Sequence, residues 1–365
     1  MFRYVIISSM ILFSSCHKKH ENKNVPQLQT NKYTFHSEIM GEERSYAVYS
    51  PTTFEQKTPL PVLFILDGPS YFSFFKALSD QWGNKKEIVL PEMIIVAIKQ
   101  NNRSSEFLPS YIDDGKGDKF LRHIEKELIP AIESSYNVLP NRTLFGHSRG
   151  GLFALNVLLT APELFNNFIV SDPSISLGNS TLIKRWNSTQ LSFDDHNNNV
   201  FVGLADTKEG YSLDYVLDTN SDAFPHMRTI WSFCEKLEAD SINNQNFKWK
   251  YYEGFGHGTI PAMVAMDGLL SVFEYYRMDK YGLIYSHLNG IINYDQFKQK
   301  IISHFKEISE RMGSKVLPYE SLIFEYGQIF LEEKMNDKAI EMFQWNVDNF
   351  PENTRSLEKL EELSI

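Results

Sequence analysis

The chain has 365 residues, of which 42% are hydrophobic and 14% aromatic, enough for one large domain with a smaller unit beside it. This composition excludes an intrinsically disordered chain. The formal net charge of −10 argues against nucleic acid as a partner, because binding to a phosphate backbone depends on clustered Lys and Arg.

Residues 1–16 predict an export signal of the lipoprotein type. Residues 1–15 carry a single Arg followed by a mostly apolar run, and Cys16 follows two small residues. We expect Cys16 to be lipidated, which would tether an exported protein to the bacterial cell envelope, on its periplasmic or surface side. An ordinary cleaved signal with an incidental Cys16 is the alternative. The polar residues 17–32 then form a tether, and no later segment is apolar enough to span a membrane.

Residues 33–278 show the pattern of a layered domain. After a strand pair at its start, short apolar runs alternate with longer helical segments. This alternation predicts the α/β class, with a mostly parallel sheet covered by helices on both faces. The apolar runs are residues 61–66, 93–98, 142–145, 167–170, 200–204 and 247–252.

Residues 279–365 lose the strand pattern and predict a small helical unit. Within it, residues 320–353 resemble one tetratricopeptide-like repeat, and a generic helical hairpin is the alternative. One repeat cannot bury its faces alone, so we expect it to pack on the preceding α/β domain or on the helices between residues 294 and 312. Its free surface is a candidate site for a protein partner. The matching small, small, large and Pro positions are Gly327, Ala339, Phe343 and Pro351.

The strongest signal for chemistry is the sequence Gly-His-Ser-Arg-Gly around Ser148. It follows the apolar run 142–145 and opens the helical segment 152–159. A strand, a tight turn with glycines flanking a serine, and a helix are the parts of a nucleophile elbow, which raises the serine hydroxyl above the carboxyl ends of a parallel sheet. The pattern predicts an α/β-hydrolase fold with Ser148 as the nucleophile.

A serine nucleophile needs a base, which in this fold comes last in chain order. His257 is the candidate because it lies in a Gly-rich loop directly after the run 247–252. The acid that orients the base is expected after a strand between the two. Asp206 is the first choice, with Glu209 in the same loop and Asp172 after the preceding strand as alternatives. A Ser-His dyad without an acid stays open.

Two backbone N–H groups are expected to stabilise the oxyanion of a tetrahedral intermediate. One belongs to Arg149, the residue after the nucleophile. The other is expected in the loop after the run 61–66. Pro69 in that loop has no N–H, so the candidates are Ser70, Tyr71 and Gly68.

Several segments resemble the esterase family that includes esterase D, feruloyl esterases and ferric-siderophore esterases, over about residues 33–278. The matching segments are Phe64-Ile65-Leu66-Asp67-Gly68, Arg103 with Glu106 and Pro109, residues 120–136, the Ser148 elbow, Ser171-Asp172-Pro173-Ser174 and Gly256-His257. The chain also resembles a group that carries a tetratricopeptide unit after the esterase domain. The resemblance implies two-step hydrolysis of a carboxylic ester through an acyl-enzyme on Ser148, with His257 as base and without a metal or organic cofactor.

The substrate is expected to be a small-molecule or oligosaccharide ester, and two classes stay open. A siderophore-type ester is a bulky anion and would favour Arg or Lys at the pocket mouth, with Arg103 as one candidate. An acylated plant polysaccharide would favour aromatic walls, for which Tyr71 and Trp186 are candidates.

Two alternative functions use the same sequence features. A thioesterase, peptidase or acyltransferase would need the same catalytic residues, because leaving-group choice depends on pocket shape. A non-catalytic surface lipoprotein would instead bind a partner through the helical repeat.

Overall fold

The computed structural model describes residues 29–51, 59–83, 88–189, 198–218, 224–240, 246–352 and 354–364. The predicted export signal, Cys16 and residues 17–28 of the predicted tether lie outside the described residues. The first strand begins at Gln29, so residues 29–32, which we assigned to the tether, belong to the sheet.

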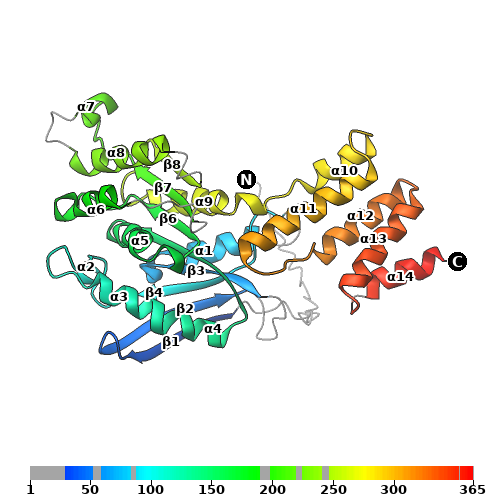
Figure 1. Ribbon diagram of the computed structural model, residues 1–365, viewed down its shortest axis with the longest axis horizontal. Helices are drawn as coiled ribbons and strands as arrows, with labels where there is room; N and C mark the ends of the chain where they lie inside the picture. Colours follow the sequence, from blue (N-terminus) through cyan, green and yellow to red (C-terminus); the bar gives the residue numbers. More distant parts are fainter. Residues whose placement is uncertain are drawn as a thin grey trace, which may run out of the picture.

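An eight-stranded sheet forms the centre of the molecule, with the strand order β1-β2-β4-β3-β5-β6-β7-β8 (Figure 1). The two N-terminal strands are antiparallel, and β3 to β8 run parallel to one another. Each apolar run singled out in the sequence lies largely within one of these parallel strands, which confirms the predicted α/β class. The strands are β1 (Gln29–Ser37), β2 (Glu42–Ser50), β3 (Leu60–Ile65), β4 (Ile94–Lys99), β5 (Val138–His147), β6 (Asn167–Ser171), β7 (Asn199–Ala205) and β8 (Phe247–Tyr252).

Helices cover both faces of the sheet, because alternate strand residues point to opposite sides. In β3, Val62 and Phe64 join the core under one group of helices, whereas Leu63 and Ile65 join the core under the other. The first group comprises α2 (Arg103–Glu106), α3 (Gly117–His123), a π-helical turn (Ile124–Leu128), α4 (Ile129–Ser135), α5 (Arg149–Thr160), α6 (Leu177–Ser188), α7 (Leu213–Leu217) and α8 (Pro225–Ala239). The second comprises α1 (Gly68–Trp82) and α9 (Ile260–Val272).

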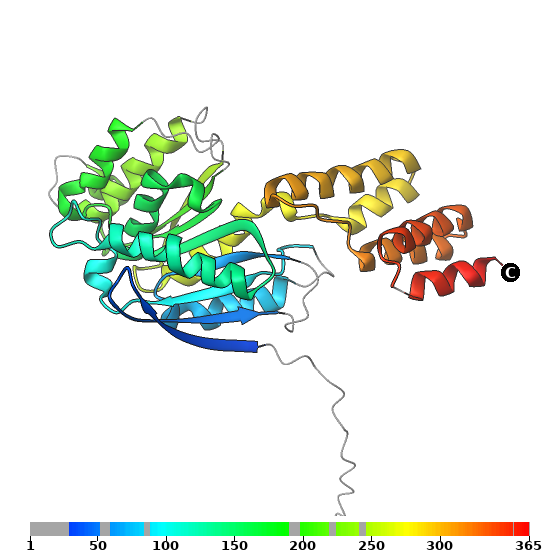
Figure 2. The same ribbon diagram turned by 60° about the horizontal axis from the view of Figure 1, so that its bottom comes forward.

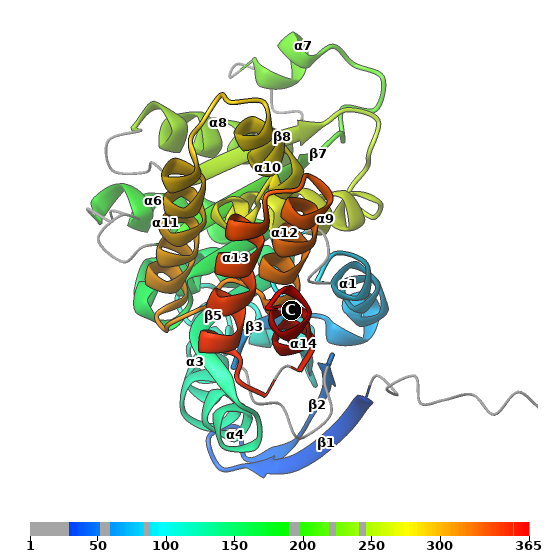
Figure 3. The same cartoon turned by 90° about the vertical axis from the view of Figure 1, so that its right-hand side faces the viewer.

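A C-terminal group of helices extends from one end of this layered domain (Figure 2). It packs against the amino ends of the parallel strands, as the view from that side shows (Figure 3). There the Asn141 side chain, in β5, donates a hydrogen bond to the carbonyl oxygen of Arg311 at 3.0 Å. The helices are α10 (Lys280–Leu288), α11 (Tyr294–Met312), α12 (Glu320–Glu332), α13 (Asn336–Asn349) and α14 (Thr354–Leu363).

The predicted repeat corresponds to the helical hairpin of α12 and α13. The two helices meet where Gly327 faces the Phe343 ring, and a Cβ at Gly327 would lie 2.5 Å from that ring. The pair forms because a glycine on one helix admits an aromatic side chain of the other. The assignment of this hairpin to the tetratricopeptide family stays a prediction. No helix in the described ranges is long and apolar enough to cross a membrane.

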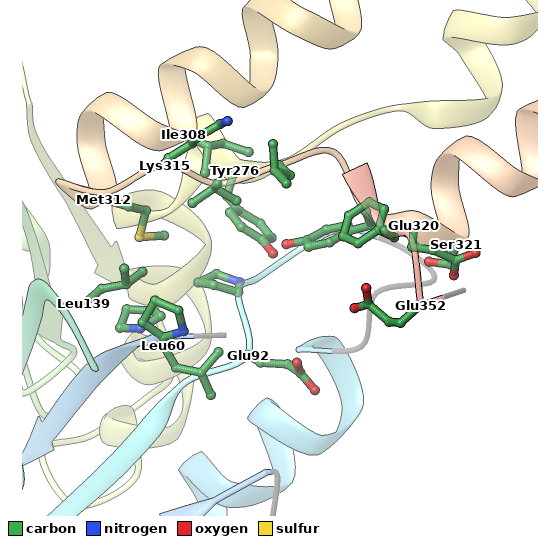
Figure 4. Close-up of a pocket in the computed structure, with 17 residues that line it drawn as sticks. Leu60, Glu92, Leu139, Tyr276, Ile308, Met312, Lys315, Glu320, Ser321 and Glu352 are labelled. Atoms are coloured by element: carbon green, nitrogen blue, oxygen red, sulfur yellow. The ribbon is translucent and has the colours of Figure 1, made fainter. Parts of the chain in front are cut away.

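A cavity of about 620 Å³ lies between the C-terminal helices and the amino ends of β3 and β5 (Figure 4). Leu60 and Leu139 line it from the sheet, and Met312 and Glu320 line it from the helical side. It therefore lies at the end of the sheet opposite Ser148, which follows the carboxyl end of β5.

Candidate active site

Ser148 occupies the strained turn between β5 and α5. Its backbone has φ 59° and ψ −118°, a conformation that side chains rarely adopt. The turn is tight enough that a Cβ at Gly146 would lie 2.2 Å from the carbonyl oxygen of Gly150, so only glycine fits there. The sequence motif is therefore a nucleophile elbow in the structure, and the half-buried Ser148 side chain lies above the carboxyl ends of the strands.

Three side chains from three loops form a hydrogen-bonded chain at this elbow. Ser148 Oγ lies 3.1 Å from His257 Nε2, and His257 Nδ1 lies 2.5 Å from Asp172 Oδ2. The loops follow β5, β8 and β6 respectively. The geometry fits a hydroxyl that donates to Nε2 and an Nδ1–H that donates to the carboxylate, which is the arrangement of a Ser-His-Asp triad.

The structure corrects our first choice of acid. Asp206 lies away from the His257 ring: it accepts hydrogen bonds from Lys208 Nζ at 2.6 Å and from the backbone N–H of Gly254 at 2.9 Å. Lys208 and these backbone donors hold the pKa of Asp206 at about 2, against the effect of its burial. Glu209 is exposed to solvent. Asp172, one of the two alternatives, is the carboxylate that contacts the base.

Asp172, and not Asp206, contacts His257 because of the order of the strands in the sheet. Its strand β6 lies directly beside β5, whereas Asp206 follows β7, one strand further from the elbow. Asp172 has no solvent exposure, and its second oxygen, Oδ1, accepts the backbone N–H of Ala205 at 3.1 Å. Burial alone would raise the pKa of Asp172, but hydrogen bonds from His226 and His257 hold it well below its ordinary value.

Sequence reasoning missed two histidines at this site. His226, near the start of α8, places Nε2 at 3.1 Å from Asp172 Oδ2, the same oxygen that His257 contacts. His147 places Nδ1 at 2.9 Å from the Tyr71 hydroxyl and Nε2 at 2.9 Å from the carbonyl oxygen of His257. Burial, with the neighbouring His257, lowers the pKa of His147 to about 4, so this ring is neutral at pH 7. His147 could have been suspected from its place in the elbow, but no sequence spacing points to His226.

The structure narrows the candidates for the oxyanion donors. The N–H of Ser70 already donates to the carbonyl oxygen of Asp67 at 2.9 Å. Tyr71 lies one residue further into α1, past the first-turn positions whose backbone N–H groups lack a partner within the helix. The N–H groups of Gly68 and Arg149, the first residues of α1 and α5, have no hydrogen-bond partner in the described part of the chain. These two therefore remain as candidates.

Arg103 joins the two loops that carry these donors. Its guanidinium donates to both carboxylate oxygens of Asp67, at 2.7 and 2.9 Å, and to the carbonyl oxygen of His147 at 3.3 Å. We expected Arg103 to bind substrate. In the structure its guanidinium forms this bidentate ion pair with Asp67. Trp186, also expected at the substrate, is only 6% exposed and packs in the core against Phe233, so it does not line the site.

A small pocket of about 350 Å³ opens beside the catalytic histidine. Exposed aromatic side chains lie next to it, because Phe224, one of its lining residues, contacts the ring of Tyr211. Tyr211 stacks on Tyr215 at 5.1 Å between ring centroids, and the two residues are 51% and 46% exposed. The residues that line the pocket are Ser174, Thr207, Phe224, His226, Met227 and His257.

The sequence is similar to those of known esterases. Residues 37–211 match the family model described as "Putative esterase". The chain is 31% identical over 169 residues to the ferri-bacillibactin esterase BesA of Bacillus subtilis, covering 40% of this chain and 58% of that protein. It is 32% identical over 155 residues to the siderophore triacetylfusarinine C esterase of Aspergillus fumigatus, covering 37% and 52%. The matched part thus spans just over half of these relatives.

Solved structures share the fold over most of the chain. An IroE-like serine hydrolase from Shewanella oneidensis superposes with a TM-score of 0.69 at 23% identity, covering 88% of this chain and 100% of that one. An uncharacterised protein from Capnocytophaga ochracea gives a TM-score of 0.61 at 12% identity, covering 92% and 89%. These likenesses confirm the α/β-hydrolase fold. The match over residues 37–211 confirms the resemblance to this esterase family that the sequence motifs indicate.

Proposed function

We propose that this protein is a serine carboxylic-ester hydrolase. The observation that carries the proposal is the chain of contacts from Ser148 Oγ through His257 to the buried Asp172, at 3.1 and 2.5 Å, placed on a nucleophile elbow. A serine becomes nucleophilic when an adjacent imidazole accepts its proton, and the imidazole is held in the correct tautomer by a carboxylate.

The reaction follows from these contacts in two steps. Ser148 Oγ attacks the acyl carbon while His257 Nε2 takes the hydroxyl proton, and collapse of the tetrahedral intermediate breaks the ester bond. His257 returns the proton to the leaving alcohol, which leaves an acyl group on Ser148. A water molecule then gives a proton to His257 and attacks the acyl carbon, and the second tetrahedral intermediate collapses as His257 returns the proton to Ser148 Oγ, which releases the acid and restores the serine. Asp172 stays ionised and stabilises the imidazolium in both steps.

We assign the oxyanion site to the N–H groups of Arg149 and Gly68. Both stand at the first residue of a helix, where backbone N–H groups lack helical partners and the helix dipole favours negative charge. The ion pair between Arg103 and Asp67 supports the assignment, because it fixes the loop before Gly68 against the elbow. A preorganised donor of this kind contributes about 3 to 4 kcal/mol to the stabilisation of the transition state.

We propose a siderophore-type ester as the substrate class. The curated relatives are named as siderophore esterases, and two features of this chain fit a bulky anionic substrate with aromatic acyl groups. The side chain of Arg149 makes no ion pair within the described ranges, which leaves a cation beside the nucleophile. The stacked Tyr211 and Tyr215 offer exposed aromatic faces near the pocket.

We also keep an exported, lipid-anchored protein as our proposal for localisation, on the sequence of residues 1–16. A labelled fatty acid in growing cells tests it: the wild type should incorporate the label, and Cys16→Ala should not.

The enzymatic proposal is tested with p-nitrophenyl acetate and butyrate and with a fluorophosphonate probe that labels active serines. We expect the purified protein to turn over both esters and to be labelled, and Ser148→Ala to lose both properties. Ser188→Ala, which removes an exposed hydroxyl at the end of α6, is the matched control and should keep both. A wild type that neither reacts nor labels would refute the proposal.

The substrate class needs a second comparison. Ferric and iron-free tricatecholate siderophores with an ester backbone are incubated with the enzyme, alongside feruloylated and acetylated oligosaccharides, and the released acids are separated by chromatography. We expect kcat/KM for the siderophores to exceed that for the oligosaccharides by about 100-fold or more, a difference of about 2.7 kcal/mol in transition-state binding. A preference for the oligosaccharides would overturn the siderophore assignment and leave the esterase intact.

A further inference from the structure

Two histidines meet at one carboxylate oxygen beside the nucleophile. His257 Nδ1 and His226 Nε2 lie 2.5 and 3.1 Å from Asp172 Oδ2. Among the described residues these three side chains form the one group of three or more metal-ligating residues, with ligand atoms all within 4.8 Å of one another. A Ser-His-Asp triad requires only one of these histidines, so the reaction gives no reason for the second.

We propose that Asp172, His226 and His257 form a binding site for a divalent transition metal ion such as Zn²⁺, and that the bound ion switches the esterase off. Two imidazole nitrogens and one carboxylate oxygen are a common ligand set for Zn²⁺ in proteins. In such sites bonds of about 2.0 to 2.1 Å meet near the tetrahedral angle, so ligand atoms lie about 3.3 Å apart. The present separations of 2.5 and 3.1 Å reach that spacing when each imidazole moves by about 1 Å or less.

The surroundings allow an ion to reach the site. The side chains of His226 and His257 are 28% and 42% exposed, and both line the pocket of about 350 Å³ that opens beside them. A water molecule from that side would complete four-coordination. Asp172 is already arranged as a single-oxygen ligand, because Oδ1 accepts the N–H of Ala205 and Oδ2 faces the two rings.

Metal binding would remove the base by changing its tautomer. A neutral imidazole carries one proton, and His257 holds it on Nδ1 in the triad. A metal ion on Nδ1 moves that proton to Nε2, which then cannot accept the proton of Ser148. This inhibitory consequence rests on the proposed esterase function. The proposed metal-binding site does not depend on that function.

Binding is measured first, on the full-length protein with the Ser148→Ala substitution, so that the result is independent of activity. We expect one Zn²⁺ per chain by isothermal titration calorimetry, and Co²⁺ to give the visible absorption bands of a four-coordinate site. His226→Gln should weaken Zn²⁺ binding about tenfold or more. His36→Gln is the matched control, because His36 and Glu43 form an exposed His-carboxylate pair elsewhere on the sheet, and it should leave the affinity unchanged.

Inhibition is measured second, on the protein with Ser148 intact. Zn²⁺ should abolish p-nitrophenyl ester hydrolysis and EDTA should restore it, and the His226→Gln protein should need about tenfold more Zn²⁺ for the same inhibition. Equal Zn²⁺ affinity in wild type and His226→Gln would overturn the proposed site. Zn²⁺ binding that depends on His226 in a protein without esterase activity would refute the proposed function and leave the metal site standing.

Discussion

His147 Nε2 lies 2.9 Å from the backbone carbonyl oxygen of His257, so the residue before the nucleophile holds the loop of the base. The other nitrogen of the same ring faces the Tyr71 hydroxyl of α1 at 2.9 Å. A neutral imidazole has one donor and one acceptor, and this arrangement uses both: Nε2–H donates to the carbonyl, and Nδ1 accepts from Tyr71. The ring therefore joins three segments that must keep their places for Ser148 and His257 to meet.

The pKa of His147 predicts a pH dependence of stability. Its value of about 4 lies below the ordinary 6.5, so the unfolded chain binds a proton at His147 between these values and the folded protein does not. The free energy of unfolding should therefore fall as the pH falls from 6.5 to 4, by roughly 3 kcal/mol from this group. Urea unfolding of wild type and His147→Gln across this range measures it. The free energy of unfolding of the variant should depend less on pH than that of the wild type. An equal dependence on pH in the two proteins would contradict the prediction.

Substitution of Asp172 should harm catalysis far more than substitution of Asp206. Asp172→Asn removes the acceptor that fixes the His257 tautomer, and we expect kcat to fall about 10³- to 10⁴-fold. Asp206→Asn loosens the pairing with Lys208 in the same loop, and kcat should change by about threefold or less, as for a partly solvated ion pair. Ester hydrolysis by the two purified variants checks this. A larger fall in kcat for Asp206→Asn than for Asp172→Asn would indicate that Asp206 is the catalytic acid.

Trp186 should behave as a core residue. Trp186→Ala removes a ring that packs at 5.1 Å from Phe233, and we expect a loss of about 3 to 5 kcal/mol in the free energy of unfolding. Tyr211→Ala is the informative contrast, because Tyr211 is exposed near the pocket. It should leave stability nearly unchanged and raise KM for aromatic esters. Thermal melts and steady-state kinetics on both proteins separate the two roles.

Breaking the buried ion pair between Arg44 of β2 and Glu106 should destabilise the protein strongly. Arg44 donates to both oxygens of Glu106 at 2.8 Å, and the two residues are 1% and 2% exposed. Arg44→Met leaves the Glu106 carboxylate without its partner, and we expect a loss of about 3 to 5 kcal/mol in the free energy of unfolding. The exposed partner is the control: Glu42→Gln should cost about 1 kcal/mol or less. Chemical denaturation measures both, and a loss below 1 kcal/mol for Arg44→Met would contradict the prediction.

The structural features that depend on a local sequence pattern could be predicted from the sequence. The parallel strands, the elbow at Ser148 and the Gly-rich loop of His257 each follow from residues close together in the chain, and the structure shows each of them. Residues 120–136, one of the segments that resemble the esterase family, lie mostly in α3, the π-helical turn at Ile124–Leu128 and α4.

What the sequence could not give depends on the order of strands in space. A carboxylate after β6 and one after β7 look alike in sequence, and the choice between them follows only from β6 lying beside β5. Trp186 resembled a pocket residue because its type fits an aromatic wall, but the packing of α6 against α8 buries it. His226 stands 54 residues from its partner Asp172, so their contact exists only in the folded chain.

β1 runs in the same direction as β4, which determines the end of the sheet at which the described chain begins. Because both pair antiparallel with β2, the chain enters the sheet at Gln29 at the end where the parallel strands β3 to β8 start, and Ser148 lies past the opposite end. The C-terminal helices occupy the entry side as well. The mouth of the active site therefore opens at the end of the molecule that neither the start of the first strand nor the C-terminal helices occupy.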